Sequence, residues 1–447
     1  MLSLKSKPMQ TWKNWSGHVK SSPQKLIYPQ NIEEVSTLIH HCIKQKQRLR
    51  VVGSGHSFTP LVHTNQLLVS LDDMQGIVEV NQEERWAEVW AGTKLKSLSR
   101  LLHEHGMALE NMGDIDHQSI AGALSTGTHG TGVHLGNLST QIKELTIVSG
   151  TGEVITCSNE RNQNLFKAAS VSLGALGIIV KVKLNVVPAY KLHCRSYKQN
   201  LSNCLDQLDH LKSNRNFEFF YYPHTKTTQI KITNETRKPS SSNHRLQKFK
   251  NVVLENYVFW MLSEVSRIAP RLSKAISKIS ASGVPNTENI DYSPFIYTSE
   301  RLVKFYEMEY CVPEANLKKV VEKMKNSMDQ HQFAVHFPIE CRFVKKDDIW
   351  LSPSYQRNSA YIAVHMYKGM KYEAYFKEME SILQKYNGRP HWGKMHTLTP
   401  ESLRKLYPKW DDFGEMRKQM DPYGIFLNEY LEKIFDINNT RKSEGIA

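Results

Sequence analysis

A short glycine-rich segment follows an apolar run near the start of the chain. Residues 49–52 have the apolar character of a strand, and Gly53-Ser54-Gly55-His56-Ser57 comes directly after them. Glycine lets a backbone turn through positive φ and approach a ligand closely, because it carries no Cβ. The amides of successive turn residues then form a concave cradle for an anion such as a pyrophosphate. A Gly-x-Gly sequence also occurs in ordinary turns, so this segment alone is a weak indication of a phosphate-binding turn.

A second glycine-rich segment lies at residues 121–132. It lacks the Gly-Lys-Ser/Thr ending of a Walker loop. It also lacks the Gly-x-Gly-x-x-Gly pattern that opens a helix after a strand in a dinucleotide-binding βαβ unit. Its small residues, free amides and hydroxyls are instead suited to a long, flat, phosphorylated ligand.

The two segments in order, Gly53-Ser54-Gly55-His56-Ser57 and Gly127-Thr128-His129-Gly130-Thr131-Gly132, resemble the flavin domain of the vanillyl-alcohol oxidase superfamily. Within it, the chain is similar to the aldonolactone oxidoreductases (gulonolactone and arabinonolactone oxidases) and to the alditol oxidases. The similarity runs from Trp15 to Asn428. It implies FAD as the cofactor, attached covalently through His56 to the 8α-methyl group of the flavin.

The resemblance also implies which residues contact the cofactor. The expected cofactor-binding residues are Gly53, Ser54, Gly55, His56, Ser57, Gly113, Asp114, Ser119, Gly122, Ala123, Thr126, Gly127, His129, Gly130, Gly177, Ile179 and His391. Among them, Gly113 aligns with the position over the C4a edge of the flavin, where a methyl group can hinder dioxygen. Glycine leaves that path open, so the resemblance implies an oxidase that makes hydrogen peroxide.

Glu340-Cys341-Arg342 is a strand-like triplet. Side chains alternate along a strand, so Glu340 and Arg342 share one face. By themselves they would be interpreted as a surface ion pair. The resemblance favours a functional role, because a strand reaching His365 and the motif His391-Trp392-Gly393-Lys394 follow at the family's spacing. The expected catalytic residues are therefore Glu340, Arg342, His365 and Lys394.

Flavin oxidation of an alcohol carbon requires that a hydride goes to flavin N5 and that the hydroxyl loses a proton. Positive charge near N1–C2=O of the reduced flavin lowers the barrier. Lys394 and Arg342 are the candidates for that charge, and the fork of donors on Arg342 suits polyol or lactone oxygens. Glu340 is expected to orient Arg342 and to accept a substrate hydroxyl. The base is either His365 or Lys394, the latter if neighbouring cations depress its pKa.

The sequence leaves three functions open. The first is oxidation of a sugar 1,4-lactone, the second is oxidation of an alditol, and the third is a non-catalytic basic binding protein on a flavin-domain scaffold. The presence together of His56, Glu340, Arg342 and Lys394 favours an enzyme. No metal is expected, because there is no HExxH motif and the histidines lack a matching carboxylate spacing.

Composition limits the partners. A chain of 447 residues is long enough for two domains. The net charge of +14 is spread along the sequence, without a nucleic-acid-binding motif, so nucleic acid is not an expected partner. No segment approaches the roughly 20 apolar residues of a membrane span. The six cysteines lack CxxC spacing, and the charged residues 1–7 precede no apolar signal region, so we expect a cytoplasmic protein.

Periodicity predicts the elements that position these residues. A helix over residues 29–47 is expected to begin at an Asn31 cap, and a second helix is expected over 93–105 with Gly106 at its end. Gly150-Thr151-Gly152 indicates a hairpin turn. The expected strands in this part are 49–52, 67–71, 77–80, 86–90, 142–148, 153–156 and 178–180.

After Pro188 the pattern changes to that of a second domain. Strands are expected at 217–222, 307–310 and 362–365, a Ser- and Lys-rich surface loop at 237–250, and a helix at 251–280. For that helix, packing on its own domain is favoured over binding to a membrane surface. The expected fold class is α+β, with a PCMH-type FAD-binding domain (1–188), a cap domain of antiparallel sheet flanked by helices (189–396), and a C-terminal segment (397–447) that completes the FAD domain.

Overall fold

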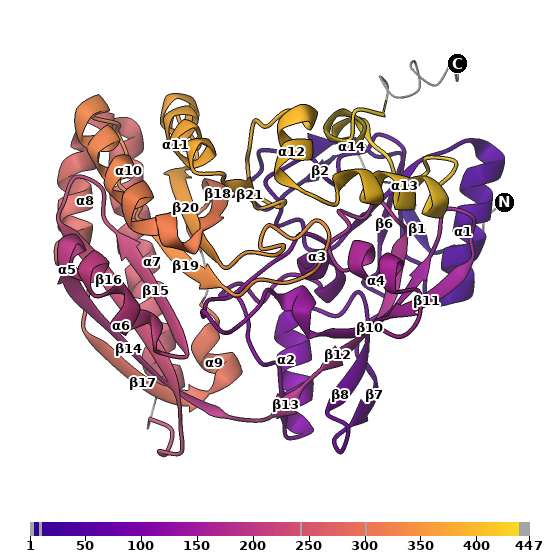
Figure 1. Cartoon of the computed structure of the whole chain (residues 1–447), viewed down its shortest axis with the longest axis horizontal. Coiled ribbons are helices and arrows are strands. Elements are labelled where there is room, and N and C mark those ends of the chain that lie inside the picture. Colours follow the sequence, from indigo (N-terminus) through magenta and orange to yellow (C-terminus); the bar gives the residue numbers. More distant parts are fainter. Residues whose placement is uncertain (1–3, 9–10, 242–243, 300–301, 438–447) are drawn as a thin grey trace.

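The computed structural model describes residues 4–8, 11–241, 244–299 and 302–437. Residues 1–3 and 438–447, at the ends of the predicted first and last segments, lie outside the described residues. Figure 1 shows a mixed arrangement of helices and sheets, with the large sheet of the middle segment on one side and the N- and C-terminal parts together on the other. This agrees with the expected α+β class.

The strand before the first glycine-rich segment belongs to a four-stranded sheet in the order β1-β4-β6-β5, in which β4 and β5 both run parallel to β6. The strands are β1 (Ser6–Pro8), β4 (Lys25–Ile27), β5 (Leu49–Val52) and β6 (Leu67–Ser70). Helix α1 (Ile32–Gln45) connects β4 to β5, and its Asn31 cap is confirmed, since the side chain accepts the Glu34 N–H at 2.8 Å.

A five-stranded antiparallel sheet, ordered β11-β10-β12-β8-β7, supports the second glycine-rich segment. It comprises β7 (Ile77–Asn81), β8 (Trp86–Trp90), β10 (Ile142–Val148), β11 (Val154–Ser158) and β12 (Ile178–Asn185). The predicted hairpin between β10 and β11 is confirmed. The same part of the chain contains the helices α2 (Leu95–Glu104), α3 (Ile120–Ser125) and α4 (Gln163–Ala169). It also contains two short strand pairs: β2 (Trp12–Lys13) pairs with β3 (Lys20–Ser21), and β9 (Met107–Ala108) pairs with β13 (Val187–Pro188).

The middle segment forms an eight-stranded antiparallel sheet in the order β17-β14-β16-β15-β19-β20-β18-β21. Its strands are β14 (Lys191–Asn200), β15 (Asn216–Tyr221), β16 (Thr227–Thr236), β17 (Thr287–Tyr292), β18 (Phe305–Pro313), β19 (Ile339–Val344), β20 (Ser359–Tyr367) and β21 (Arg389–Pro390). Helices α5 (Leu201–Asp206), α6 (Leu208–Lys212), α7 (His244–Ile268), α8 (Ser273–Ser282), α9 (Ser293–Tyr297), α10 (Leu317–His331) and α11 (Glu373–Lys385) accompany it (Figure 1).

The C-terminal helices α12 (Pro400–Leu406), α13 (Trp410–Met420) and α14 (Glu429–Ile434) pack back on the N-terminal part (Figure 1). Phe413, Phe426 and Leu431 share one hydrophobic core with Leu38 of α1 and Leu145 of β10. A second core lies between the eight-stranded sheet and its helices.

The region around residues 237–280 differs from expectation. The predicted surface loop at 237–250 is wrong in its second half, because α7 already begins at His244. The predicted continuous helix at 251–280 is interrupted at Pro270, which lacks the N–H needed inside a helix, and it resumes as α8. Among the described residues, none of the helices combines the length and the hydropathy of a membrane span.

Candidate active site

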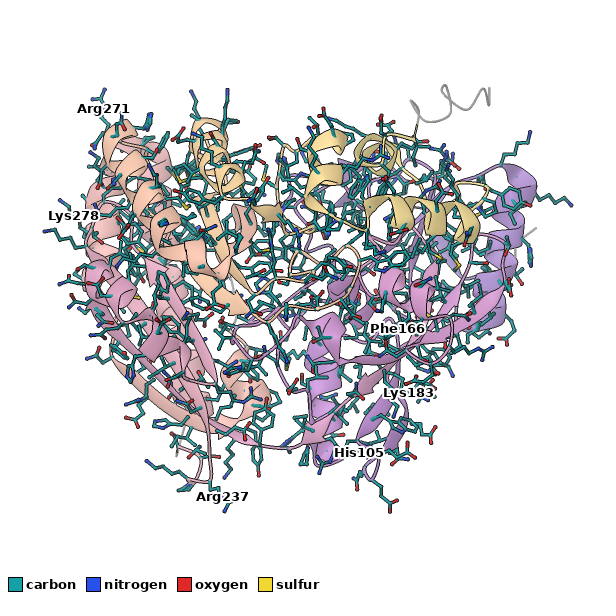
Figure 2. All side chains as sticks on the ribbon, viewed as in Figure 1. His105, Phe166, Lys183, Arg237, Arg271 and Lys278 are labelled. Atoms are coloured by element: carbon teal, nitrogen blue, oxygen red, sulfur yellow. The ribbon has the colours of Figure 1, made fainter. Side chains whose placement is uncertain are left out.

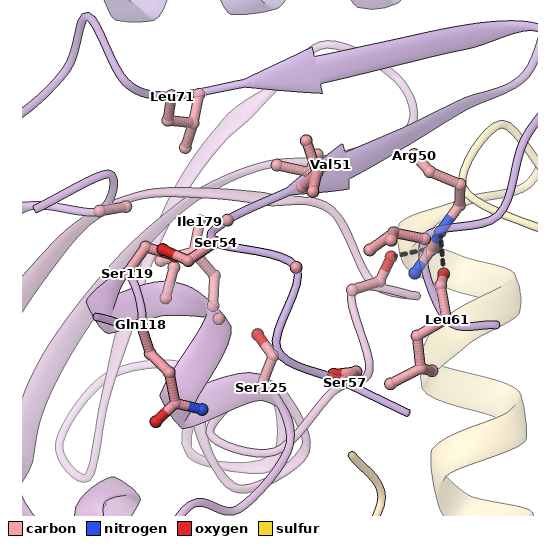
Figure 3. Close-up of a pocket in the computed structure, with 18 of the residues that line it drawn as sticks. Arg50, Val51, Ser54, Ser57, Leu61, Leu71, Gln118, Ser119, Ser125 and Ile179 are labelled. Atoms are coloured by element: carbon pink, nitrogen blue, oxygen red, sulfur yellow. Dashed lines mark hydrogen bonds between the residues drawn. The ribbon is translucent and has the colours of Figure 1, made fainter. Parts of the chain in front are cut away.

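The first glycine-rich segment lines a pocket between the four-stranded and the five-stranded sheet. Figure 3 shows Ser54, Gln118, Ser119 and Ser125 around it, with Arg50 and Leu61 to one side. The expected cofactor-binding residues that line this pocket are Gly53, Ser54, Gly55, His56, Ser57, Ser119, Gly122, Thr126, Gly177 and Ile179. Strand β5 and helix α3 thus bring both glycine-rich segments to one pocket, together with the loop before β12.

A buried arginine of β5 holds these loops in place. The Nε of Arg50 donates to the Leu61 carbonyl oxygen at 2.7 Å, and its Nη2 donates to that of Leu173 at 2.8 Å. Its Nη1 donates to the Gly174 carbonyl oxygen at 2.9 Å and to that of Phe426. One side chain of β5 therefore connects this strand to three other backbone segments around the pocket, including the C-terminal one.

The pocket has the donors and the acceptor that a flavin dinucleotide requires. In the described part of the chain, the backbone N–H groups of Ser54, Gly55, His56 and Ser57 have no protein acceptor. These four residues are half-buried in the wall of the pocket, so their amides are available to an anionic ligand. Gln118 donates through Nε2 to the Thr128 hydroxyl at 3.2 Å, whereas its buried Oε1 has no partner among the described residues. That oxygen can accept a hydrogen bond from a flavin N–H group.

A second pocket adjoins the first and shares His56, Ser57, Gln118 and Thr126 with it. All four expected catalytic residues line it: Glu340, Arg342, His365 and Lys394. Among the expected cofactor-binding residues, Gly113, Asp114, His129 and His391 also line it.

Three of the expected cofactor-binding residues line neither of these pockets. Ala123 is fully buried inside α3. Gly127 has a φ of +72°, which favours glycine for the turn itself. A Cβ at Gly130 would lie 2.2 Å from the Met112 carbonyl oxygen, so this glycine allows the close approach of two backbone segments. These three positions shape the loop rather than line the pocket.

Arg342 is held by three carboxylates. Its Nε donates to Glu218 at 2.7 Å, and its Nη2 lies 2.5 Å from Glu340 and 3.5 Å from Asp114. Lys231 lies 2.7 Å from the other oxygen of Glu218. Burial alone would raise the pKa of Glu218, but Lys231 and Arg342 lower it to about 2. The guanidinium is therefore fixed in position and permanently charged.

Glu307 of β18 lies between the other two expected catalytic residues. It forms an ion pair with Lys394 and lies 3.5 Å from the Nε2 of His365, its partner across the strands. Burial would lower the pKa of Lys394, but Glu307 and Glu309 hold it above its usual value. The condition for Lys394 to act as the base, a pKa depressed by neighbouring cations, is not met, because its nearest charged neighbours are carboxylates.

In the neutral form of His365, the ring nitrogen that carries no proton is Nε2, the one that faces Glu307. Its Nδ1 lies 3.1 Å from the Pro338 carbonyl oxygen, which can only accept a hydrogen bond, so Nδ1 carries the proton. The Nε2 of the neutral ring is then unprotonated and can take a proton. The Glu307 carboxylate would stabilise the imidazolium that results.

A third group of ionisable side chains lies where β18 meets the second glycine-rich segment. His129 lies 2.8 Å from the Gly130 carbonyl oxygen through Nδ1 and 3.2 Å from Glu309 through Nε2. Both partners are acceptors, so whichever ring nitrogen of His129 carries a proton donates a hydrogen bond to one of them. His391 accepts the Gly393 N–H at 3.0 Å, and burial lowers the pKa of His391 to about 3.

The ligand atoms of His129, Glu309 and His391 lie within 4.8 Å of one another, which would suffice for a divalent cation. No metal was expected, because the sequence has no HExxH motif and its histidines lack a matching carboxylate spacing. Their hydrogen bonds already give each histidine a role in the protein, and we assign no metal to them.

His56 lies at the junction of the two pockets, between aromatic rings. The Trp15 ring is stacked at a centroid distance of 5.9 Å, and the His117 ring at 6.3 Å. Burial, together with the nearby His117, Lys394 and Lys94, lowers the pKa of His56 to about 4. The imidazole is therefore neutral and nucleophilic at neutral pH.

Sequence reasoning missed four charged residues of this site: Glu218, Lys231, Glu307 and Glu309. A signal existed for two of them, since strand alternation places Glu307 and Glu309 on one face of β18. Glu218 was expected only as part of the strand at 217–222. Its contact with Arg342 joins residues 124 positions apart, which no local pattern reveals.

Family models match most of the chain. Residues 23–158 match the model described as an FAD binding domain, and residues 182–434 match the model described as D-arabinono-1,4-lactone oxidase. The solved structure of cholesterol oxidase from B. sterolicum is similar in fold, with a TM-score of 0.79 over 97% of both chains at 16% identity.

Curated relatives share about a third of their residues with this chain over the aligned length. It is 35% identical to L-gulono-1,4-lactone dehydrogenase of Mycobacterium tuberculosis, covering 95% of this chain and 98% of the relative. It is 32% identical to L-gulonolactone oxidase of Mus musculus, with the same coverage. It is 30% identical to D-arabinono-1,4-lactone oxidase of Kluyveromyces lactis over 74% of this chain and 66% of that relative.

Proposed function

This chain belongs to the D-arabinono-1,4-lactone oxidase family, and on that premise we propose that it oxidises an alcohol carbon of a sugar 1,4-lactone and passes the electrons through FAD to dioxygen. The observation that supports this proposal is the meeting of two pockets at His56. One has unpaired backbone amides for a dinucleotide, and the other has Glu340, Arg342, His365 and Lys394.

We propose that FAD is attached covalently through His56. The residue lies at the junction of the pockets, and its neutral imidazole has a lone pair available for bonding to the flavin. The backbone amides of the segment that contains it would hold the pyrophosphate. Attachment would fix the reactive ring beside the second pocket.

When bound, FAD supplies the hydride acceptor for the reaction. His365 takes the hydroxyl proton at Nε2, and Glu307 stabilises the charged imidazole that results. Lys394 and Arg342 supply positive charge next to the reacting groups, where negative charge develops during reduction. Glu340 holds Arg342 and accepts a hydrogen bond from a substrate hydroxyl.

The charges of the second pocket favour a neutral substrate. Four carboxylates line it (Asp114, Glu307, Glu309 and Glu340), against the two side-chain cations Arg342 and Lys394. Carboxylates accept hydrogen bonds from the hydroxyls of a lactone or a polyol and repel the carboxylate of an open-chain aldonic acid. We therefore expect the lactone to be oxidised and its hydrolysed form to be neither a substrate nor a good inhibitor.

A hydrogen-peroxide assay over sugar 1,4-lactones, alditols, simple sugars and aldonates tests the proposal. We expect lactones to have the highest kcat/KM and aldonates to give no turnover. Preferred oxidation of alditols would replace the lactone assignment by the alditol one. No flavin in the purified protein and no oxidation of any of these compounds would contradict an enzymatic function and leave the binding-protein alternative.

A further inference from the structure

A row of charged side chains crosses three strands of the eight-stranded sheet. Lys231 of β16 lies directly opposite Glu218 of β15, and Glu218 lies directly opposite Arg342 of β19. Residues that face each other across paired strands have their side chains on the same face of the sheet. The contacts follow this register. The Nζ of Lys231 lies 2.7 Å from Oε1 of Glu218, and the Nε of Arg342 donates to Oε2 of the same carboxylate at 2.7 Å. One carboxylate thus joins a lysine to the arginine of the candidate active site.

Lys231 lies outside the second pocket. It lines a separate cavity of about 20 Å³, whose walls also include Asp114, Glu218, Tyr297 and Arg342. Asp114 and Arg342 line both this cavity and the second pocket, so these two residues lie between Lys231 and the space where a substrate would bind. Any influence of Lys231 on the reaction must therefore act through its neighbours.

Lys231 differs from the basic side chains at the surface of the same segment. Figure 2 shows Arg237, Arg271 and Lys278 projecting away from the ribbon at the edge of the molecule. Lys231 is half-buried and forms an ion pair with a buried carboxylate. Burial would lower the pKa of Lys231, but Glu218 raises it above its usual value. The lysine is therefore positively charged at neutral pH.

The charge of Lys231 matters because carboxylates outnumber cations around Arg342. Three carboxylates contact the guanidinium, those of Glu218, Glu340 and Asp114. With Lys231, two cations face these three carboxylates. Without it, Arg342 alone would face all three, and less of its positive charge would stabilise negative charge that develops in the second pocket.

We propose that Lys231 is a positioning residue of the reaction, which neutralises Glu218 and so keeps the positive charge of Arg342 available to the second pocket. This proposal rests on the proposed function, because it assigns Arg342 the same role. It adds a residue that touches neither the substrate nor the cofactor and acts on the reaction across two strands.

Anaerobic reduction of the flavin by substrate tests this proposal in two backgrounds, the wild type and Glu218→Gln. The substrate is the compound with the highest kcat/KM in the hydrogen-peroxide assay, whichever class it belongs to. Lys231→Met removes the charge and Lys231→Arg keeps it. The matched control is Lys212→Met, because Lys212 also pairs with a carboxylate, Glu314 at 2.6 Å, and its side chain is 19% exposed against 28% for Lys231. Lys212 lines neither the two pockets nor the small cavity.

We expect Lys231→Met to slow flavin reduction about tenfold in the wild-type background. In the Glu218→Gln background it should slow reduction by less than about twofold, because no carboxylate is left there for the lysine to neutralise. Lys231→Arg should stay within about twofold of the wild type, and Lys212→Met should match it. A merely structural defect would act equally in both backgrounds. If Lys231→Met does not fold, Lys231→Gln, which keeps a hydrogen-bond donor but no charge, takes its place.

Urea unfolding at a series of pH values gives a second measurement that needs no substrate. Burial and the nearby Asp114 would raise the pKa of Glu218, but Lys231 and Arg342 lower it to about 2. Without Lys231 this pKa should lie closer to its ordinary value of 4.5. A smaller depression of the pKa gives a smaller loss of stability in acid. The free energy of unfolding of Lys231→Met should therefore fall less steeply than that of the wild type between pH about 4.5 and about 2.

Equal slowing by Lys231→Met in both backgrounds would overturn this proposal. A wild-type reduction rate in Lys231→Met would also overturn it, and so would a Lys231→Arg variant as slow as Lys231→Met, or an unchanged decline of stability in acid. In each of these cases the wild type is still reduced by its substrate, so the proposed function stands. A wild type whose flavin none of the assayed compounds reduces would overturn the proposed function and, with it, the role of Lys231.

Discussion

The Nε2 atom of His365 lies 3.5 Å from the Oε1 atom of Glu307, its direct partner across the antiparallel strands β18 and β20. Glu307 also pairs with Lys394. One buried carboxylate thus contacts both groups that the sequence offered as the base. It keeps Lys394 protonated, and it leaves His365 as the group that can take a proton.

Replacing His365 by Asn should slow reduction of the flavin by substrate by about 10²- to 10⁴-fold, the usual loss when a general base is removed. Flavin content should not change, because His365 lies in the second pocket and not in the first. Anaerobic stopped-flow measurement of flavin bleaching gives the rate. A His365→Asn variant that reduces at the wild-type rate would exclude His365 as the base.

Lys394→Met and Arg342→Met should each fold and keep flavin but lose about a hundredfold in turnover. Each removes one charge contact beside the reacting groups, which typically costs about 3 kcal/mol. The same stopped-flow experiment applies, with Lys318→Met as the control because this lysine is exposed on α10, outside the site. Normal flavin reduction in both variants would show that the second pocket is not where the reaction occurs.

Much of the fold could be predicted from the sequence, because its elements follow local rules. Asn31 caps α1 as expected, and residues 49–52, 86–90 and 142–148 form strands with the predicted bounds. Local rules failed at α7, where lysines and serines before residue 250 suggested a loop. A helix that packs on its domain through one face tolerates such residues on the other faces.

The candidate site was predicted in part. Residues that belong to a contiguous motif, such as His56 and Lys394, could be identified from the sequence and do line the pockets. The partners that set their charge could not, because strand pairing brings them from distant positions. Glu218 reaches Arg342 only because β15 pairs with β19 in the register that places the two residues opposite each other.

Stability in acid should depend on Glu218. Its pKa is 4.5 ordinarily and about 2 in the folded protein, because Lys231 and Arg342 outweigh the effect of burial. A carboxylate with a depressed pKa stabilises the fold fully above its unfolded pKa, and this contribution is lost as the pH falls from about 4.5 to about 2. It amounts to on the order of 3 kcal/mol. Urea unfolding at a series of pH values measures the free energy of unfolding. Glu218→Gln should be less stable than the wild type at neutral pH, and its free energy of unfolding should fall less steeply than that of the wild type below pH about 4.5. An unchanged decline would assign the acid sensitivity to other groups.

The covalent bond to flavin should depend on His56 alone. Wild-type protein should fluoresce as a flavoprotein band on a denaturing gel, and His56→Ala should not. His117→Ala is the matched control, because it removes the ring stacked on the other side of His56 and leaves the attachment point in place. Flavin released from the wild type by denaturation would contradict covalent attachment, and a fluorescent His56→Ala band would place it at another residue.

The electron acceptor should depend on Gly113. Relatives named oxidase and dehydrogenase are both about a third identical to this chain, so similarity alone does not decide whether it uses dioxygen. Gly113 lines the second pocket, and a Cβ there would lie 3.0 Å from the His129 carbonyl oxygen and 3.7 Å from the Thr128 methyl carbon. One added methyl group thus requires the His129 carbonyl to give by a few tenths of an ångström, and by the family resemblance it would lie over the C4a edge of the flavin.

We expect Gly113→Ala to slow reoxidation of the reduced flavin by dioxygen while sparing its reduction by substrate. Gly393→Ala is the control, since its Cβ would also enter the second pocket, 3.3 Å from the His391 ring and 3.4 Å from the Ser57 hydroxyl. Mixing the reduced form of each variant with oxygenated buffer in a stopped-flow instrument measures its reoxidation rate. Equal reoxidation rates in Gly113→Ala and the wild type would show that Gly113 does not control the access of dioxygen. Equal slowing in Gly113→Ala and Gly393→Ala would show that crowding of the pocket is the cause. A wild type whose reduced flavin does not react with dioxygen would refute the oxidase assignment itself.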